Sequence, residues 1–119
     1  MACEIISIDG DFVHIRISGI MRVADLRTLQ ASGLELIRQG NKLRLLVLLE
    51  DFQGWEQSGD WANTGFLPDQ DRGIHKIAIV GDEQWRDQAC AFVAQGLRPF
   101  AIEYFASSAQ AEAERWLQA

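Results

Sequence analysis

Three pairs of carboxylates have the residue types and the spacing that general acid–base chemistry requires. They are Glu50 with Asp51, Asp69 with Asp71, and Asp82 with Glu83. In such a pair one carboxyl group can donate a proton while the other accepts one. Each pair falls at a predicted strand end, in a loop or at a helix start, where acidic residues are common for structural reasons. The sequence has no HExxH, GxGxxG or P-loop motif and no Ser-His-Asp order, so we expect no enzymatic activity.

Cysteine and histidine are the other residue types that could do chemistry, through a metal ion. Cys3, His14, His75 and Cys90 are widely separated and form neither a CxxC pair nor another regular metal-ligand spacing. We therefore predict no metal site and no cofactor. Both cysteines are expected to be reduced thiols that pack as small hydrophobic side chains.

Charge and hydropathy limit the partners and the location of the protein. Eleven Lys and Arg residues stand against seventeen Asp and Glu residues, which gives a net charge of −6. This excess repels phosphate backbones, so nucleic acid is excluded as an expected partner. The longest apolar run, residues 45–49, is far shorter than the roughly 20 residues that cross a bilayer, and the start MACEIIS does not resemble a signal peptide. We expect a cytoplasmic protein.

An unusual group of aromatic residues occupies the stretch between two predicted strands. Phe52, Trp55, Trp61 and Phe66 are four of the eleven aromatic residues in the chain. The best helical piece of the stretch, residues 61–67, does not form one dense apolar stripe, so a single core face cannot accept all its large side chains. Some of them must be partly exposed, line a cavity or meet another molecule.

Three interpretations of this segment are open. The residues could be ordinary core that covers one face of the sheet. They could instead form a lid over an apolar pocket that binds a hydrophobic small molecule or lipid and touches a membrane. A third interpretation is an interface with a protein partner or a second copy of the chain. The ligand-binding and lid residues of the second interpretation are Phe52, Trp55, Trp61, Phe66 and Leu67.

The elements that position these residues follow from apolar periodicity and turn residues. Strands are predicted at 3–8, 11–18, 42–51, 77–80 and 100–106, and helices at 23–40, 82–96 and 107–119. Gly33 lies on the apolar face of the first helix, where it would permit close approach to the sheet. Ser107 would cap the last helix together with Gln110. At 119 residues the chain is expected to form one α/β domain, 1–119, with a mixed sheet.

The whole chain resembles the SpoIIAA-like branch of the STAS-domain superfamily, which includes bacterial anti-sigma factor antagonists. The resemblance rests on RLLVLLEDFQGW (44–55), HKIAIVGDEQW (75–85), IEYF (102–105) and SSAQAEAERWL (107–117). It implies a STAS fold, an α/β mixed sheet of four or five strands with about four helices. It also implies a domain without established enzymatic activity.

The resemblance raises an alternative function at Ser58. In the anti-sigma factor antagonists, a serine in a D-S-S-G-type turn after the central strand is phosphorylated to break a partner contact. The comparable stretch here is EQSGD (56–60), so Ser58 is the nearest match, while Glu56 and Gln57 depart from the pattern. The alternative is therefore a regulatory protein-binding module switched by phosphorylation of Ser58. A plain loop or N-cap serine is the favoured interpretation of this position, because capping is a common use of serine before a helical run.

Overall fold

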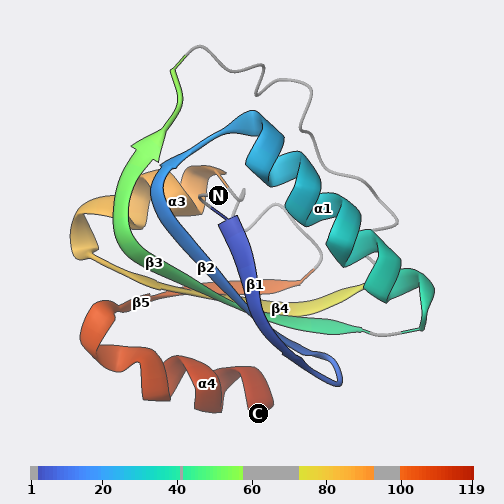
Figure 1. Cartoon of the computed structure of the whole chain (residues 1–119). Coiled ribbons are helices and arrows are strands. Elements are labelled where there is room, and N and C mark those ends of the chain that lie inside the picture. The colour runs from blue at the N-terminus through green and yellow to red at the C-terminus, as the bar shows by residue number, and fades with distance from the viewer. Residues whose placement is uncertain (1–2, 41, 58–72, 93–99) are drawn as a thin grey trace.

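The computed structural model of the chain describes residues 3–40, 42–57, 73–92 and 100–119. Within these residues lie five strands and three α-helices, labelled as in Figure 1. Short 3₁₀ turns at Glu83–Trp85 and Ser107–Ala109 lead into the last two helices. The elements are β1 (Cys3–Asp9), β2 (Phe12–Met21), α1 (Val23–Arg38), β3 (Leu43–Trp55), β4 (Ile74–Gly81), α3 (Arg86–Phe92), β5 (Ala101–Ala106) and α4 (Gln110–Gln118).

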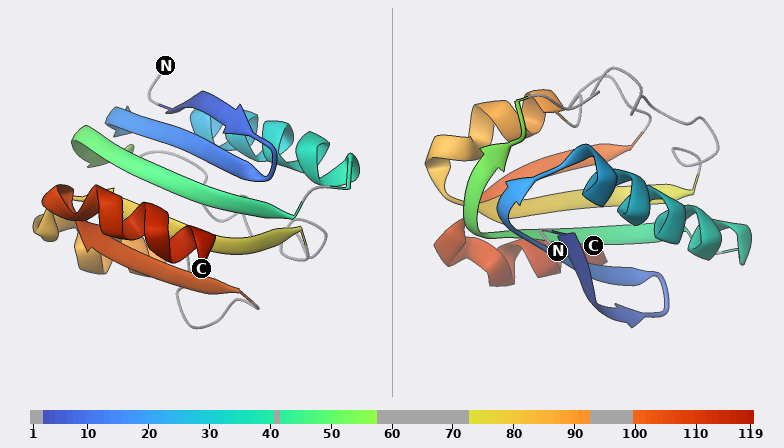
Figure 2. Two further views of the ribbon diagram at one scale, coloured as in Figure 1. Left: turned by 90° about the horizontal axis from the view of Figure 1, so that it is seen from below. Right: turned by 45° about the horizontal axis from the view of Figure 1, so that its top comes forward.

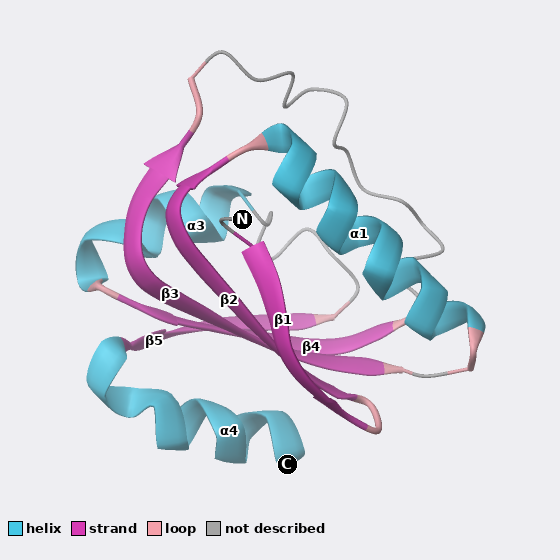
Figure 3. Ribbon diagram, in the orientation of Figure 1, coloured by secondary structure: helices cyan, strands magenta, loops and turns pink. Residues whose placement is uncertain are grey.

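The strands form one mixed sheet in the order β1-β2-β3-β4-β5. β1 and β2 are antiparallel, and the other neighbouring pairs are parallel. Helices α1 and α3 cover one face of this sheet, and α4 covers the other (Figures 1, 2 and 3). The mixed α/β sheet predicted from the sequence is confirmed. The described residues contain three α-helices, where about four were expected.

Strand register sorts the apolar side chains into two layers. Ile15 pairs with Val47, and Val47 with Ile79, which places these side chains on the face under α1 and α3. Because successive side chains of a strand point to opposite faces, Leu46 and Ala78 point to the other face. There they pack in the cluster that α4 contributes to. The sheet therefore has core on both sides.

Strand β3 continues to Trp55, four residues beyond its predicted end. Asp51 has φ 53°, and the pairing with β2 shifts register between Leu49 and Phe52. One extra residue on β3 therefore forms a β-bulge, which reverses the alternation of side chains after it. As a result Phe52 turns to the face under α1 and is buried there with Met21.

Helix α4 is held to the sheet at its C-terminal end. The Arg44 guanidinium donates to the Leu117 carbonyl at 2.9 Å, and the Lys76 ammonium donates to the Trp116 carbonyl at 2.9 Å. Both cations also favour the negative end of the helix dipole. The predicted cap at the other end is wrong: no side chain caps α4, and Ser107 belongs to the 3₁₀ turn. The 3₁₀ turn therefore connects β5 to α4 without a side-chain cap.

A hydrogen bond from Tyr104 ties β5 to the turn before α3. The Tyr104 hydroxyl donates to the Asp82 carbonyl at 2.7 Å, and the Arg86 guanidinium lies 5.1 Å from the centre of the Tyr104 ring. Tyr104 is only 4 % exposed. Burial, followed by the negative charge of Glu83, raises the pKa of Tyr104 from 10.0 to about 12.

This raised pKa predicts a loss of stability at alkaline pH. Between pH 10 and about 12 the unfolded chain loses the phenolic proton while the folded chain keeps it, so the free energy of unfolding falls as pH rises. Below pH 10 the contribution of Tyr104 is complete. Urea titrations across this range should show the decline in the wild type and a shallower one in Tyr104→Phe. Parallel pH profiles of the two proteins would contradict the prediction.

Candidate ligand-binding cavity

A cavity of about 360 Å³ lies between α1 and the sheet. Its volume equals that of about twelve molecules of liquid water. The floor consists of β-branched and leucine side chains of the sheet, among them Ile15, Val47 and Ile79. Of the described lining residues, Gln30 is the only one with a side-chain amide, and none carries an ionisable side chain. The described residues therefore give the cavity apolar walls with very few polar groups.

Helix α1 forms the roof because its apolar residues recur at helical spacing. Leu26, Leu29 and Leu36 face the sheet and line the cavity. Gly33 lines it as well, but the expected close approach to the sheet is wrong. A Cβ at Gly33 would meet no atom of the described residues within 4 Å. The missing side chain leaves space under the middle of the helix instead of bringing the backbones together.

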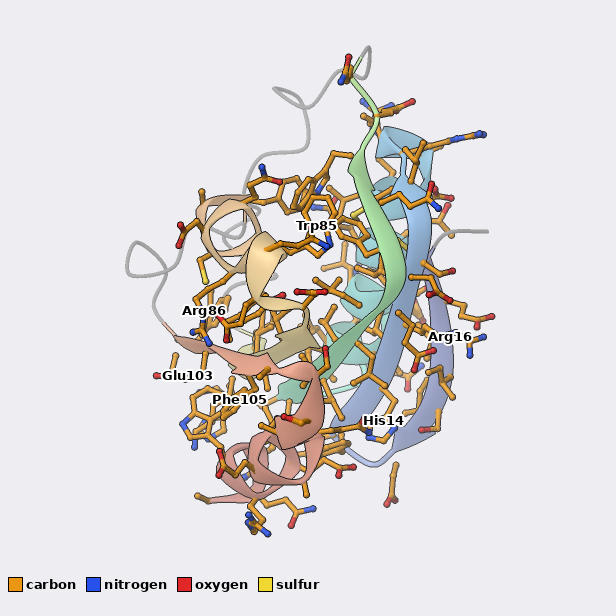
Figure 4. The ribbon with its side chains drawn as sticks, turned by 90° about the vertical axis from the view of Figure 1, so that its left-hand side faces the viewer. His14, Arg16, Trp85, Arg86, Glu103 and Phe105 are labelled. Carbon is orange, nitrogen blue, oxygen red and sulfur yellow. The ribbon has the colours of Figure 1, made fainter. Side chains whose placement is uncertain are left out.

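Aromatic rings close one end of the cavity. The Trp55 ring centre lies 5.0 Å from that of Phe52, 6.1 Å from that of Trp85 and 5.4 Å from that of Phe92. Figure 4 shows the Trp85 side chain between α3 and β3. Gly54 has φ 109° and lies against this ring, since a Cβ there would be 3.5 Å from Trp85 Cη2. Edge-to-face contacts of this kind are among the arrangements that aromatic pairs prefer.

The structure places the predicted site residues in two groups. Phe52 and Trp55 are at the end of β3, and both line the cavity. Trp61, Phe66, Leu67 and Ser58 lie outside the described residues. Phe92 lines the cavity and Trp85 packs behind it, but the sequence analysis did not identify either as a site residue. Both fall at apolar positions of the helix predicted at 82–96, a pattern that is equally typical of ordinary core.

The chain leaving β3 is joined to the start of α1. The Glu56 amide donates to the Met21 carbonyl at 2.9 Å, and the Glu56 carboxylate accepts from the Val23 amide at 2.8 Å. A carboxylate at this position satisfies an otherwise unpaired N–H of the first helical turn and favours the positive end of the helix dipole. The aromatic end of the cavity and the N-terminus of its roof are thus held together.

Four of the residues considered for chemistry have structural roles, namely Asp82, Glu83, Cys3 and Cys90. The Asp82 carboxylate accepts from the Gln84 amide at 3.3 Å, and Glu83 pairs with Arg86 at 2.7 Å, which lowers the pKa of Glu83. Burial raises the pKa of Cys3 to about 11 and also raises the pKa of Cys90. Both thiols are free and stay protonated at neutral pH. Within the described ranges, no three Cys, His, Asp or Glu residues gather as metal ligands.

Fold and cavity together define a small α/β domain with an apolar cavity under α1. The SpoIIAA-like family model matches residues 12–118, so the chain belongs to the SpoIIAA-like family, as its sequence resemblance indicated. A crystal structure of an uncharacterised DUF3478-family protein from Shewanella loihica, described as having a SpoIIAA-like fold, is similar with a TM-score of 0.69. The two chains are 18 % identical, and the similarity covers 98 % of this chain and 92 % of that one. This similarity establishes the fold.

A search of curated proteins finds no match. None of the described helices is both long enough and apolar enough to span a membrane.

Proposed function

We propose that this protein is a non-enzymatic binding domain whose ligand is a hydrophobic small molecule or lipid-like chain, held between α1 and the sheet. The observation that carries the proposal is the apolar cavity of about 360 Å³. Ligand sites in proteins have volumes of about 300 to 1,000 Å³ and mostly apolar walls. A water molecule needs two to four polar partners, and the described walls supply few. An apolar guest would regain the van der Waals contacts that the empty space lacks.

The proposal includes the place where the ligand would be taken up. Apolar molecules concentrate in bilayers, so we expect the protein to take up its ligand during brief contact with a membrane surface. The two free thiols, Cys3 and Cys90, fit a cytoplasmic location, where cysteines stay reduced.

Filling the cavity should weaken binding strongly, and Gly33 is the position for this test. The substitution Gly33→Leu places four carbon atoms where no described atom lies within 4 Å of the Cβ, and leucine also has the better helix propensity. We expect its affinity for the neutral dye N-phenyl-1-naphthylamine to fall roughly tenfold or more below wild type. The affinity is measured by the rise in dye fluorescence.

The matched control is Ser32→Leu. It adds the same side chain to the neighbouring, exposed position of α1, so it should bind the dye as the wild type does. Thermal unfolding of both variants checks that the helix is intact. Equal affinities for Gly33→Leu and wild type would show that the dye binds elsewhere and would contradict the proposal.

Native mass spectrometry of protein purified from its own host tests which function operates. Added mass that extracts into organic solvent supports the carried ligand. Phosphate-sized mass on Ser58, with no extractable ligand, supports the alternative module switched by phosphorylation.

A further inference from the structure

The indole nitrogen of Trp55 is a buried hydrogen-bond donor for which the described residues supply no acceptor. Trp55 lines the cavity, and no described residue accepts a hydrogen bond from its Nε1 atom. Buried tryptophan N–H groups normally have a partner, because a donor withdrawn from water without one lowers stability. A buried donor without a partner in the wall of a binding cavity is therefore a feature that the bound state can explain.

We propose that the ligand carries a neutral oxygen acceptor, of the ketone or ester type, that accepts a hydrogen bond from Trp55 Nε1. This inference rests on the proposed function, and it adds the chemical class of the ligand. The acceptor replaces the water that solvates the indole in the unfolded chain. The ligand is then an apolar body with one carbonyl group at its aromatic end.

The surroundings of Trp55 fix the donor before the ligand arrives. Trp55 pairs with Met21 across the last residues of β2 and β3, so its backbone is part of the sheet. Its ring is packed edge-on against Phe52, with centres 5.0 Å apart, and lies tilted against Phe92. A donor held in this way loses little side-chain freedom on binding. The N–H can therefore distinguish ligands with an acceptor from those without one.

The acceptor is neutral because the described walls hold no compensating charge. No lysine, arginine or histidine side chain is among the described lining residues. Transferring a carboxylate into such a space without a cation is very unfavourable. A ketone or ester oxygen accepts a hydrogen bond without that penalty.

The test uses two probes that differ only at the acceptor, 2-undecanone and 2-methyl-1-undecene. A =CH₂ group in the second replaces the carbonyl oxygen of the first. Each probe displaces N-phenyl-1-naphthylamine from wild type and from Trp55→Phe, which keeps an aromatic ring and lacks the donor. We expect the substitution to weaken ketone binding roughly three- to tenfold and to leave alkene binding nearly unchanged. Taking the ratio of the two effects cancels the different hydration of the probes.

A control variant and a second readout keep the result independent of folding. Trp85→Phe removes an indole outside the described lining, so it should affect both probes equally. The ¹H–¹⁵N signal of the Trp55 indole in wild type should shift with the ketone and far less with the alkene. If both probes bind but Trp55→Phe weakens them equally, the acceptor proposal is overturned and the apolar site stands. If neither probe displaces the dye, the proposed function itself is overturned.

Discussion

The substitution Leu117→Ala is expected to lower the free energy of unfolding by about 2 to 5 kcal/mol. Leu117 is 0 % exposed and packs from α4 against the sheet in one cluster with Leu46 and Ala78. Truncation of its side chain leaves a cavity that the short helix cannot close, because hydrogen bonds from Arg44 and Lys76 fix the carbonyls of the last turn. Urea denaturation followed by circular dichroism measures the change.

The same helix offers the control for this prediction. Gln118 is exposed, so Gln118→Ala should change stability by less than about 0.5 kcal/mol. A total stability of about 5 to 15 kcal/mol is typical of a small domain, so the loss at Leu117 is a large share of it. A Leu117→Ala variant as stable as Gln118→Ala would show that α4 does not anchor this face.

The substitution Phe52→Ala is expected to cost about 3 to 5 kcal/mol. The Phe52 side chain is 7 % exposed, and its ring centre lies 5.0 Å from the centres of both Trp55 and Trp85. Truncation enlarges an existing cavity and leaves two indole rings without their shared neighbour. The loss is measured by urea denaturation, with tryptophan fluorescence as the probe.

Gln53 provides the comparison on the same strand. It is exposed, so Gln53→Ala should leave both the stability and the tryptophan emission close to those of the wild type. The expected contrast between Phe52 and Gln53 depends on the bulge at Asp51, which turns Phe52 inward. Similar costs for the two substitutions would mean that Phe52 is not part of the core.

Much of the fold could be predicted from local patterns. The strand predicted at 42–51 corresponds to β3, which has core on both faces, and Asp82, the first residue of the helix predicted at 82–96, is an N-cap. The end of β3 was predicted four residues early, because simple alternation places Phe52 on the opposite face. The bulge at Asp51, where φ is positive, returns Phe52 to the face under α1. An aspartate in a sequence does not by itself indicate a bulge.

The candidate site was only partly predictable, for a different reason. Phe52 and Trp55 could be predicted as site residues because they are large aromatic residues directly after a buried strand. The cavity itself depends on how far α1 stands from the sheet, and Gly33 is compatible with either a close contact or an open space. Tertiary packing decides between the two. A sequence pattern does not contain that distance.

Contacts with neighbouring elements hold helix α1 at both of its ends. At one end Glu56 holds the Val23 amide, and at the other Gly73 lies so close to Ile37 that a Cβ would come within 2.4 Å of its Cγ2 atom. The span between these supports passes over the cavity. We expect a helix held at both ends to bend between them and not to open like a hinged lid. If the cavity binds a ligand as proposed, we expect guests of different length to be accommodated by side-chain rotation and slight bending of α1 near Gly33, so that tolerance for shape would be a property of one helix.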